Sequence, residues 1–147
     1  MGRLPSLLGA TAAVAGVAAL AVVPARATTM FNTTTTTTTT WAPRPYVYVP
    51  TVTPSTIDNR PGCSHSTTAT ISTGTTGRVT RVIFTVEVAG RTIVLSATGS
   101  GSRWQATLNG GRFSPDHGGG TVRATAYGPS GRDESSAARF TLADCPA

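Results

Sequence analysis

From Cys63 onward, apolar and polar residues alternate with a period of two, and clusters of glycine, proline, serine and asparagine interrupt the alternation. Residues 79–88 show it most clearly. Side chains two positions apart on a strand point to the same side, so this segment predicts a strand with one buried face. The residues predicted to face inward are Val82, Phe84, Val86 and Val88.

The same alternation predicts further short strands, separated by turns rich in glycine. They lie over residues 67–72, 91–97, 103–108, 121–127 and 138–142, with a longer loop over residues 109–120. No segment shows a helical period of useful length. Six or seven strands of this kind predict an all-β fold, an antiparallel β-sandwich, in which the alternating faces are buried between two sheets. Its large core residues would be Phe84, Trp104 and Phe140.

Two cysteines, Cys63 and Cys145, lie at the two ends of this predicted domain. In an oxidising compartment such a pair usually forms a disulfide. Closing nearly the whole domain into one loop would stabilise it by about 4–5 kcal/mol in the chain-entropy model. Free thiols and intermolecular links are the alternatives. A zinc site is not indicated, because no second ligand cluster lies at zinc spacing.

The first 27 residues predict a secretory signal peptide. One arginine precedes an apolar run from Leu4 to Val23, and an Ala-x-Ala sequence ends at Ala27. Such a signal directs export, and its cleavage after Ala27 would leave no membrane span in the mature form. The alternative is an uncleaved membrane anchor, since the apolar run is long enough to cross a bilayer.

Residues 28–62 predict a disordered stalk rich in threonine and proline. Eight consecutive threonines occupy residues 33–40, and prolines recur after them. Such a composition has no periodic apolar face and favours an extended chain, and threonine-rich and proline-rich stretches are a compositional signal for O-glycosylation. The alternative to a plain linker is a small adhesive patch formed by three aromatic residues that follow the threonine run: Trp41, Tyr46 and Tyr48.

All 12 basic residues are arginine, and the segment after Ala27 carries 10 of them against 6 acidic residues, a net charge of +4. This balance favours acidic partners such as cell-wall polymers, anionic glycans or another surface protein. The arginines are not clustered as in nucleic-acid-binding proteins, so no nucleic-acid partner is predicted. The candidate ligand contacts are the outward residues Arg81, Arg103, Arg123 and Arg139, and Trp104 if it is exposed. Arginines spread over two sheets would be only a solvated surface, and Trp104 alternates with apolar residues as a core residue does.

Four segments together resemble a bacterial immunoglobulin-like domain of secreted or cell-surface proteins. They are the strand at 79–88 with Gly90 after it, Trp104, the strand and turn at 120–131, and the strand at 136–142. The resemblance implies an immunoglobulin-like sandwich that serves as a spacer, an adhesion module or an accessory domain. The turn at 128–132 lacks the acidic and asparagine residues usual in the family, so the resemblance carries no calcium site onto this chain.

No constellation of residues predicts catalysis. Ser114, Asp116 and His117 are too close in sequence for triad geometry, and no nucleophile motif is present. No cofactor or metal is predicted. We therefore expect a secreted, non-enzymatic binding or adhesion module at a bacterial envelope. The absence of lysine favours a GC-rich, actinobacterial genome as its source. The alternatives are a structural spacer or self-associating matrix protein and a small secreted inhibitor or effector.

Overall fold

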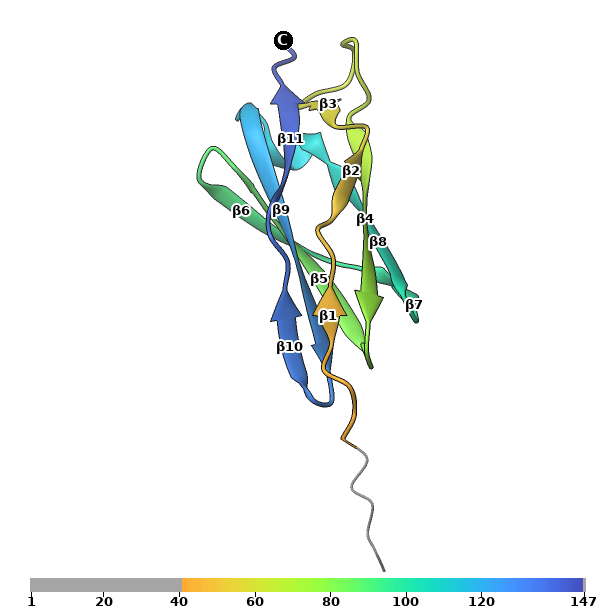
Figure 1. Ribbon diagram of the computed structural model, residues 1–147. Helices are drawn as coiled ribbons and strands as arrows, with labels where there is room; N and C mark the ends of the chain where they lie inside the picture. The colour runs from red at the N-terminus through yellow and green to blue at the C-terminus, as the bar shows by residue number, and fades with distance from the viewer. Residues whose placement is uncertain (1–40, 147) are drawn as a thin grey trace, which may run out of the picture. The chain divides into compact units, whose positions relative to one another are not determined.

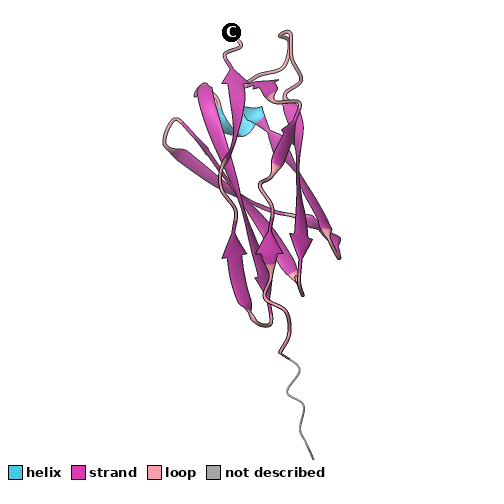
Figure 2. Ribbon diagram, viewed as in Figure 1, coloured by secondary structure: helices cyan, strands magenta, loops and turns pink. Residues whose placement is uncertain are grey.

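The computed structural model describes residues 41–146, which form an all-β unit of two sheets and one short 3-10 helix (Figures 1 and 2). The predicted signal peptide and residues 28–40 of the predicted stalk lie outside the described residues. Within residues 41–146, no helix has the length and apolar character needed to cross a membrane.

The smaller sheet has five strands, all paired antiparallel. The long strands β4 (Thr68–Thr76) and β8 (Arg103–Asn109) form its centre. The short strand β7 (Thr98–Ser100) pairs with β8, while β1 (Tyr46–Val47) and β2 (Thr51–Thr53) pair with β4 on the other side.

The larger sheet has six strands. Its main order is β3 (Thr56–Asp58), β11 (Ala138–Ala143), β9 (Gly118–Gly128), β5 (Arg81–Val88) and β6 (Arg91–Ser96), and β10 (Gly131–Glu134) also pairs with β9. The pairing of β3 with β11 is parallel, and the other pairings are antiparallel.

This distribution of strands confirms the predicted immunoglobulin-like sandwich. From β4 onward the chain crosses between the sheets three times, so that β4, β7 and β8 lie in one sheet and β5, β6, β9 and β11 in the other. An immunoglobulin sandwich places its strands in the same way, with its second, fourth and fifth strands in one sheet and its third, sixth and seventh in the other.

The core lies between the two sheets and contains the residues that alternation predicts. Val82, Phe84, Val86 and Val88 are at most 1% exposed. Trp104 is also buried, and its indole N–H donates to the hydroxyl of Thr75 at 3.2 Å. The hydroxyl of Thr75 in turn donates to the Gly101 carbonyl at 3.1 Å, so these buried polar groups are hydrogen-bonded.

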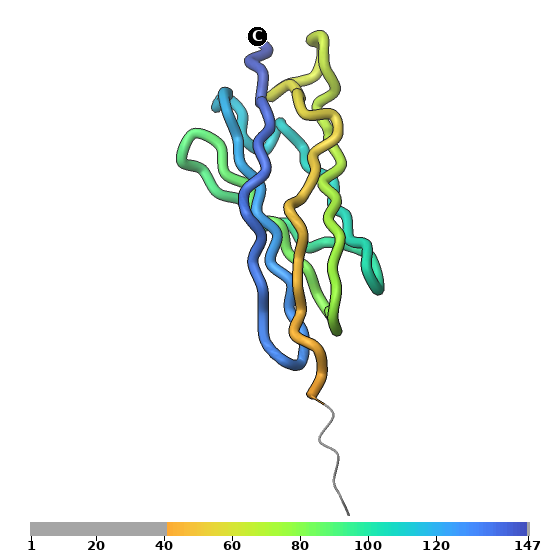
Figure 3. Tube along the Cα trace, viewed as in Figure 1, coloured from red at the N-terminus to blue at the C-terminus, as the bar shows by residue number. Residues whose placement is uncertain are grey.

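The prediction of a disordered stalk through residue 62 is wrong for its last part. Residues 46–58 form β1, β2 and β3, which run along both sheets beside the C-terminal strand (Figure 3). Each of β1 and β2 lies between prolines, and proline is tolerated in strands at a sheet edge. Val47 and Ile57 are buried, so the folded domain begins well before Cys63.

The predicted loop at 109–120 is also partly wrong. It contains the 3-10 helix η1 (Gly110–Phe113), whose Phe113 is fully buried, and β9 already begins at Gly118. A single aromatic residue among glycines gives no periodic signal. Glycine-containing segments that resemble turns are likewise strands: β4 continues to Thr76, and β7 occupies 98–100.

Candidate functional site

The four candidate arginines do not form one cluster. Arg81, Arg123 and Arg139 lie on β5, β9 and β11 of the larger sheet, whereas Arg103 lies on β8 of the smaller sheet. The guanidinium of Arg81 stacks on Tyr127 at 4.4 Å from the ring centroid. Arg123 lies 3.5 Å from a carboxylate oxygen of Glu134. On the larger sheet, two of the three candidate arginines are therefore already engaged by neighbouring side chains.

Trp104 points into the core and is not available for stacking against a sugar ring. Its side chain is 6% exposed, and besides its bond to Thr75 the indole N–H lies 3.3 Å from the Gly101 carbonyl. Of the candidate ligand contacts, the smaller sheet therefore presents only Arg103 on its surface.

An open groove of about 490 Å³ lies on the outer surface of the smaller sheet. It crosses β4 and β8 and reaches the segment that contains β2. Its lining consists of Val49, Thr51, Thr70, Ser72, Thr73, Gly74, Ser102, Arg103 and Gln105. We call this surface the hydroxyl groove.

The register of the strands sets the order of side chains in the hydroxyl groove. Ser72 is paired with Thr51 on one side and with Gln105 on the other. The hydroxyls of Thr51 and Ser72 lie 2.9 Å apart and hydrogen-bond to each other. Hydroxyls and a primary amide both donate and accept hydrogen bonds. The row of Thr51, Ser72 and Gln105 can therefore bind both hydrogen-bond donors and hydrogen-bond acceptors of a ligand.

Arg103 is the one charged residue that lines the hydroxyl groove. It stands opposite Gly74 on β4 and Ser100 on β7. The strands of the smaller sheet contain no aspartate or glutamate, and the ion pairs found within residues 41–146 do not include Arg103. Its guanidinium therefore remains available to an anionic group of a ligand.

A pair of tyrosines lies at one end of the hydroxyl groove. The rings of Tyr46 and Tyr48 meet edge to face with centroids 5.1 Å apart, and each residue is about half exposed. Tyr48 packs over Gly74, where an added Cβ would lie 3.1 Å from its ring. The sequence predicts these tyrosines as part of the stalk, and only the pairing of β1 with β4 places them on the sheet.

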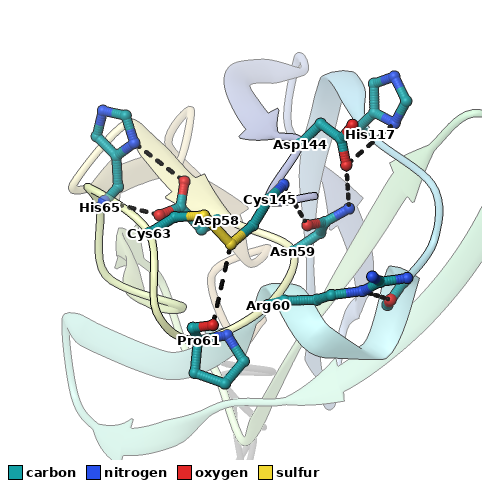
Figure 4. Close-up of a disulfide and its surroundings, with 10 residues drawn as sticks. Asp58, Asn59, Arg60, Pro61, Cys63, His65, His117, Asp144 and Cys145 are labelled. Carbon is teal, nitrogen blue, oxygen red and sulfur yellow. Dashed lines mark hydrogen bonds and ion pairs between the residues drawn. A yellow bond between two sulfur atoms is a disulfide. The ribbon is translucent and has the colours of Figure 1, made fainter. Parts of the chain in front are cut away.

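The opposite end of the domain holds a polar network around the predicted disulfide, which the structure confirms (Figure 4). The Cα atoms of Cys63 and Cys145 are 5.8 Å apart. The buried carboxylate of Asp58 accepts from the backbone N–H of His65 at 2.7 Å and lies 3.0 Å from its ring Nδ1. These contacts join the end of β3 to the loop that precedes β4, so Asp58 and His65 stabilise the loop.

The residues considered for hydrolysis have other partners. The hydroxyl of Ser114 accepts from Arg60 at 3.1 Å, and His117 lies 3.9 Å from a carboxylate oxygen of Asp144. Within residues 41–146, no group of three or more histidine, cysteine or acidic side chains could hold a metal ion.

A second open groove of about 490 Å³ lies on the larger sheet beside Arg139, and its lining also includes Phe140 and three residues of β9. The hydroxyl groove differs from it in the number of hydroxyl and amide side chains that surround its arginine.

No protein-family model matches the chain, and no curated protein matches its sequence.

Proposed function

We propose that this chain is an exported, non-enzymatic binding module that holds a hydroxyl-rich, anionic polymer of the bacterial envelope in the hydroxyl groove. The observation that carries the proposal is the position of Arg103 among hydroxyls and an amide, on strands without a carboxylate. Hydroxyl and amide side chains pair with sugar hydroxyls, and the guanidinium pairs with a carboxylate or phosphate of the same polymer.

The tyrosine pair supports this ligand class. The exposed ring of Tyr48 beside the hydroxyl groove offers a flat apolar surface with a polar hydroxyl at its rim. Such amphipathic rings suit ligands that have both C–H and O–H faces, as a pyranose ring does. An open groove buries little of each sugar unit, so we expect weak binding per site that gains strength when many copies meet one polymer.

Export fits the same proposal. The predicted signal peptide would deliver the chain to an oxidising compartment, where the Cys63–Cys145 disulfide persists. The cell wall then becomes the nearest polymer that combines hydroxyls with negative charge.

Co-sedimentation of the exported chain, residues 28–147, with purified bacterial cell walls tests the proposal. Arg103→Gln should weaken binding about 10-fold or more, because a hydrogen bond to a charged group contributes roughly 1.5–3 kcal/mol. Arg132→Gln is the matched control, since it removes the same charge from an exposed position on β10 of the other sheet, outside both grooves that hold a candidate arginine. Walls stripped of their anionic polymers should bind the wild-type chain less tightly. Equal binding by both variants would exclude the hydroxyl groove as the contact surface.

A further inference from the structure

Within residues 41–146, strand β6 forms an unpaired edge of the larger sheet. It pairs with β5 on one side, and it is the last strand in the sheet order (Figure 1). Edge strands usually carry charges, prolines or bulges that prevent pairing with another chain. Between Thr92 and Ser96, β6 has the uncharged sequence Thr-Ile-Val-Leu-Ser, without proline.

The hydrogen-bonding pattern of β6 shows which of its backbone groups have no partner in the described part of the chain. Ala97 donates to the Val82 carbonyl at 3.0 Å, which continues the register that pairs Ser96 with Ile83. Hydrogen-bonded pairs alternate along an antiparallel ladder, so the odd-numbered residues of β6 bond to β5. The N–H and C=O groups of Thr92, Val94 and Ser96 therefore point away from the sheet.

The side chains of β6 are unusual for an exposed edge. Val94 is 58% exposed, and the other large apolar residues with high exposure in residues 41–146 lie at positions 41–49. Ile93 and Leu95 are only partly buried at the margin of the core. The edge thus combines free backbone groups with apolar surface that a further strand would cover.

We propose that β6 pairs with β6 of a second copy of this chain, antiparallel and about a two-fold axis at Val94. This register makes hydrogen-bonded pairs of Val94 with its own copy and of Thr92 with Ser96 of the copy. It uses every outward backbone group of the segment, giving about six hydrogen bonds, two for each such pair. The two larger sheets become one continuous sheet.

The same register brings complementary side chains together. Ile93 of one copy stands opposite Leu95 of the other, so the two partly buried residues cover each other. Arg91 is the only charged residue of β6, and it stands opposite Ala97 of the copy. A two-fold contact of this kind is isologous and closes on itself, which predicts a dimer and not a filament.

Sedimentation velocity of residues 28–147 over micromolar to near-millimolar concentrations tests the dimer. We expect a reversible monomer–dimer equilibrium that added salt strengthens, because each copy carries a net charge of +4 (10 arginines and 6 acidic residues). Val94→Lys places two like charges together at the axis and should weaken the dimer 10-fold or more. Val49→Lys is the matched control, since it adds the same charge at a valine that is 52% exposed on the smaller sheet's side. A wild-type chain that stays monomeric throughout, or equal dimerisation by both variants, would overturn the proposal.

A cysteine scan tests the register without relying on a charged variant. Opposed residues of a hydrogen-bonded pair have Cα atoms about 5.5 Å apart, within the range that a disulfide spans. Val94→Cys should therefore form a covalent dimer under mild oxidation, since the native cysteines are already paired. Thr92→Cys should not, because its counterpart in the copy is Ser96. Equal cross-linking by both variants would exclude the two-fold axis at Val94.

Discussion

The side-chain oxygen of Asn59 accepts a hydrogen bond from the backbone N–H of Cys145 at 2.9 Å, across 86 residues of sequence. The amide nitrogen of Asn59 lies 3.3 Å from each of three acceptors: the carbonyls of Pro115 and Asp116 and a carboxylate oxygen of Asp144. Asn59 is 1% exposed. One buried amide therefore joins the loop after β3, the loop before β9 and the C-terminal segment, next to the disulfide (Figure 4).

Asn59→Asp should destabilise the domain by about 2–4 kcal/mol. The substitution keeps the acceptor for Cys145 but replaces a donor with a buried carboxylate oxygen that faces three other acceptors. Urea unfolding measures the loss. Asn109→Asp is the control, because the exposed Asn109 uses only its side-chain oxygen, which accepts from Gly111 at 2.8 Å. Similar losses for both variants would mean that the Asn59 network contributes little.

Replacing both cysteines by serine should cost about 4–5 kcal/mol of unfolding free energy. The disulfide spans 82 residues, so its removal frees nearly the whole unfolded domain from one loop constraint. Urea unfolding of the oxidised chain, the reduced chain and the double serine variant checks this value. Reduced and double-serine chains should agree, and a loss below about 1 kcal/mol would show that the unfolded state is already restricted without the bond.

The sequence predicts the strands whose alternation is regular and fails where burial depends on a distant partner. Phe84 and Val86 lie in a run of alternating residues, so their inward direction follows from the period alone. Val47 lies in a short segment bounded by prolines, and Ile57 is the one apolar residue between Pro54 and Pro61. Both become buried only because β1 and β3 pair with strands distant in sequence. The hydroxyl groove could not be predicted for the same reason, since it needs β2 beside β4.

A chain beginning at residue 41 should fold as stably as residues 28–147, whereas a chain beginning at residue 63 should not fold. The shorter chain lacks Val47 and Ile57, each contributing about 1.5–3 kcal/mol of burial, and also the Asn59 network and the parallel partner of β11. Circular dichroism melts and dispersion of amide proton resonances distinguish the outcomes. A cooperative melt for residues 63–147 would show that β1 to β3 are an accessory addition to a complete core.

Gly120 and Phe140 form a cross-strand pair in which the aromatic ring occupies the space beside the glycine. A Cβ atom added at Gly120 would overlap the Cε1 and Cζ atoms of Phe140, whereas one added at the neighbouring Gly119 would meet nothing within 4 Å. Neither glycine has a positive φ, so alanine fits the backbone at both positions. The two sites therefore differ in packing alone.

Gly120→Ala should destabilise the domain by about 1–3 kcal/mol, because Phe140 is 4% exposed and its ring must move within a packed core. Gly119→Ala should be neutral or stabilise by up to about 1 kcal/mol, since alanine restricts the unfolded chain. Urea unfolding of both variants gives the comparison. A double-mutant cycle with Phe140→Leu adds a second check: if the overlap causes the loss, the smaller side chain should recover part of it, and the two substitutions should not be additive. Additive losses would place the cause in the strand backbone of β9 and not in the contact with Phe140.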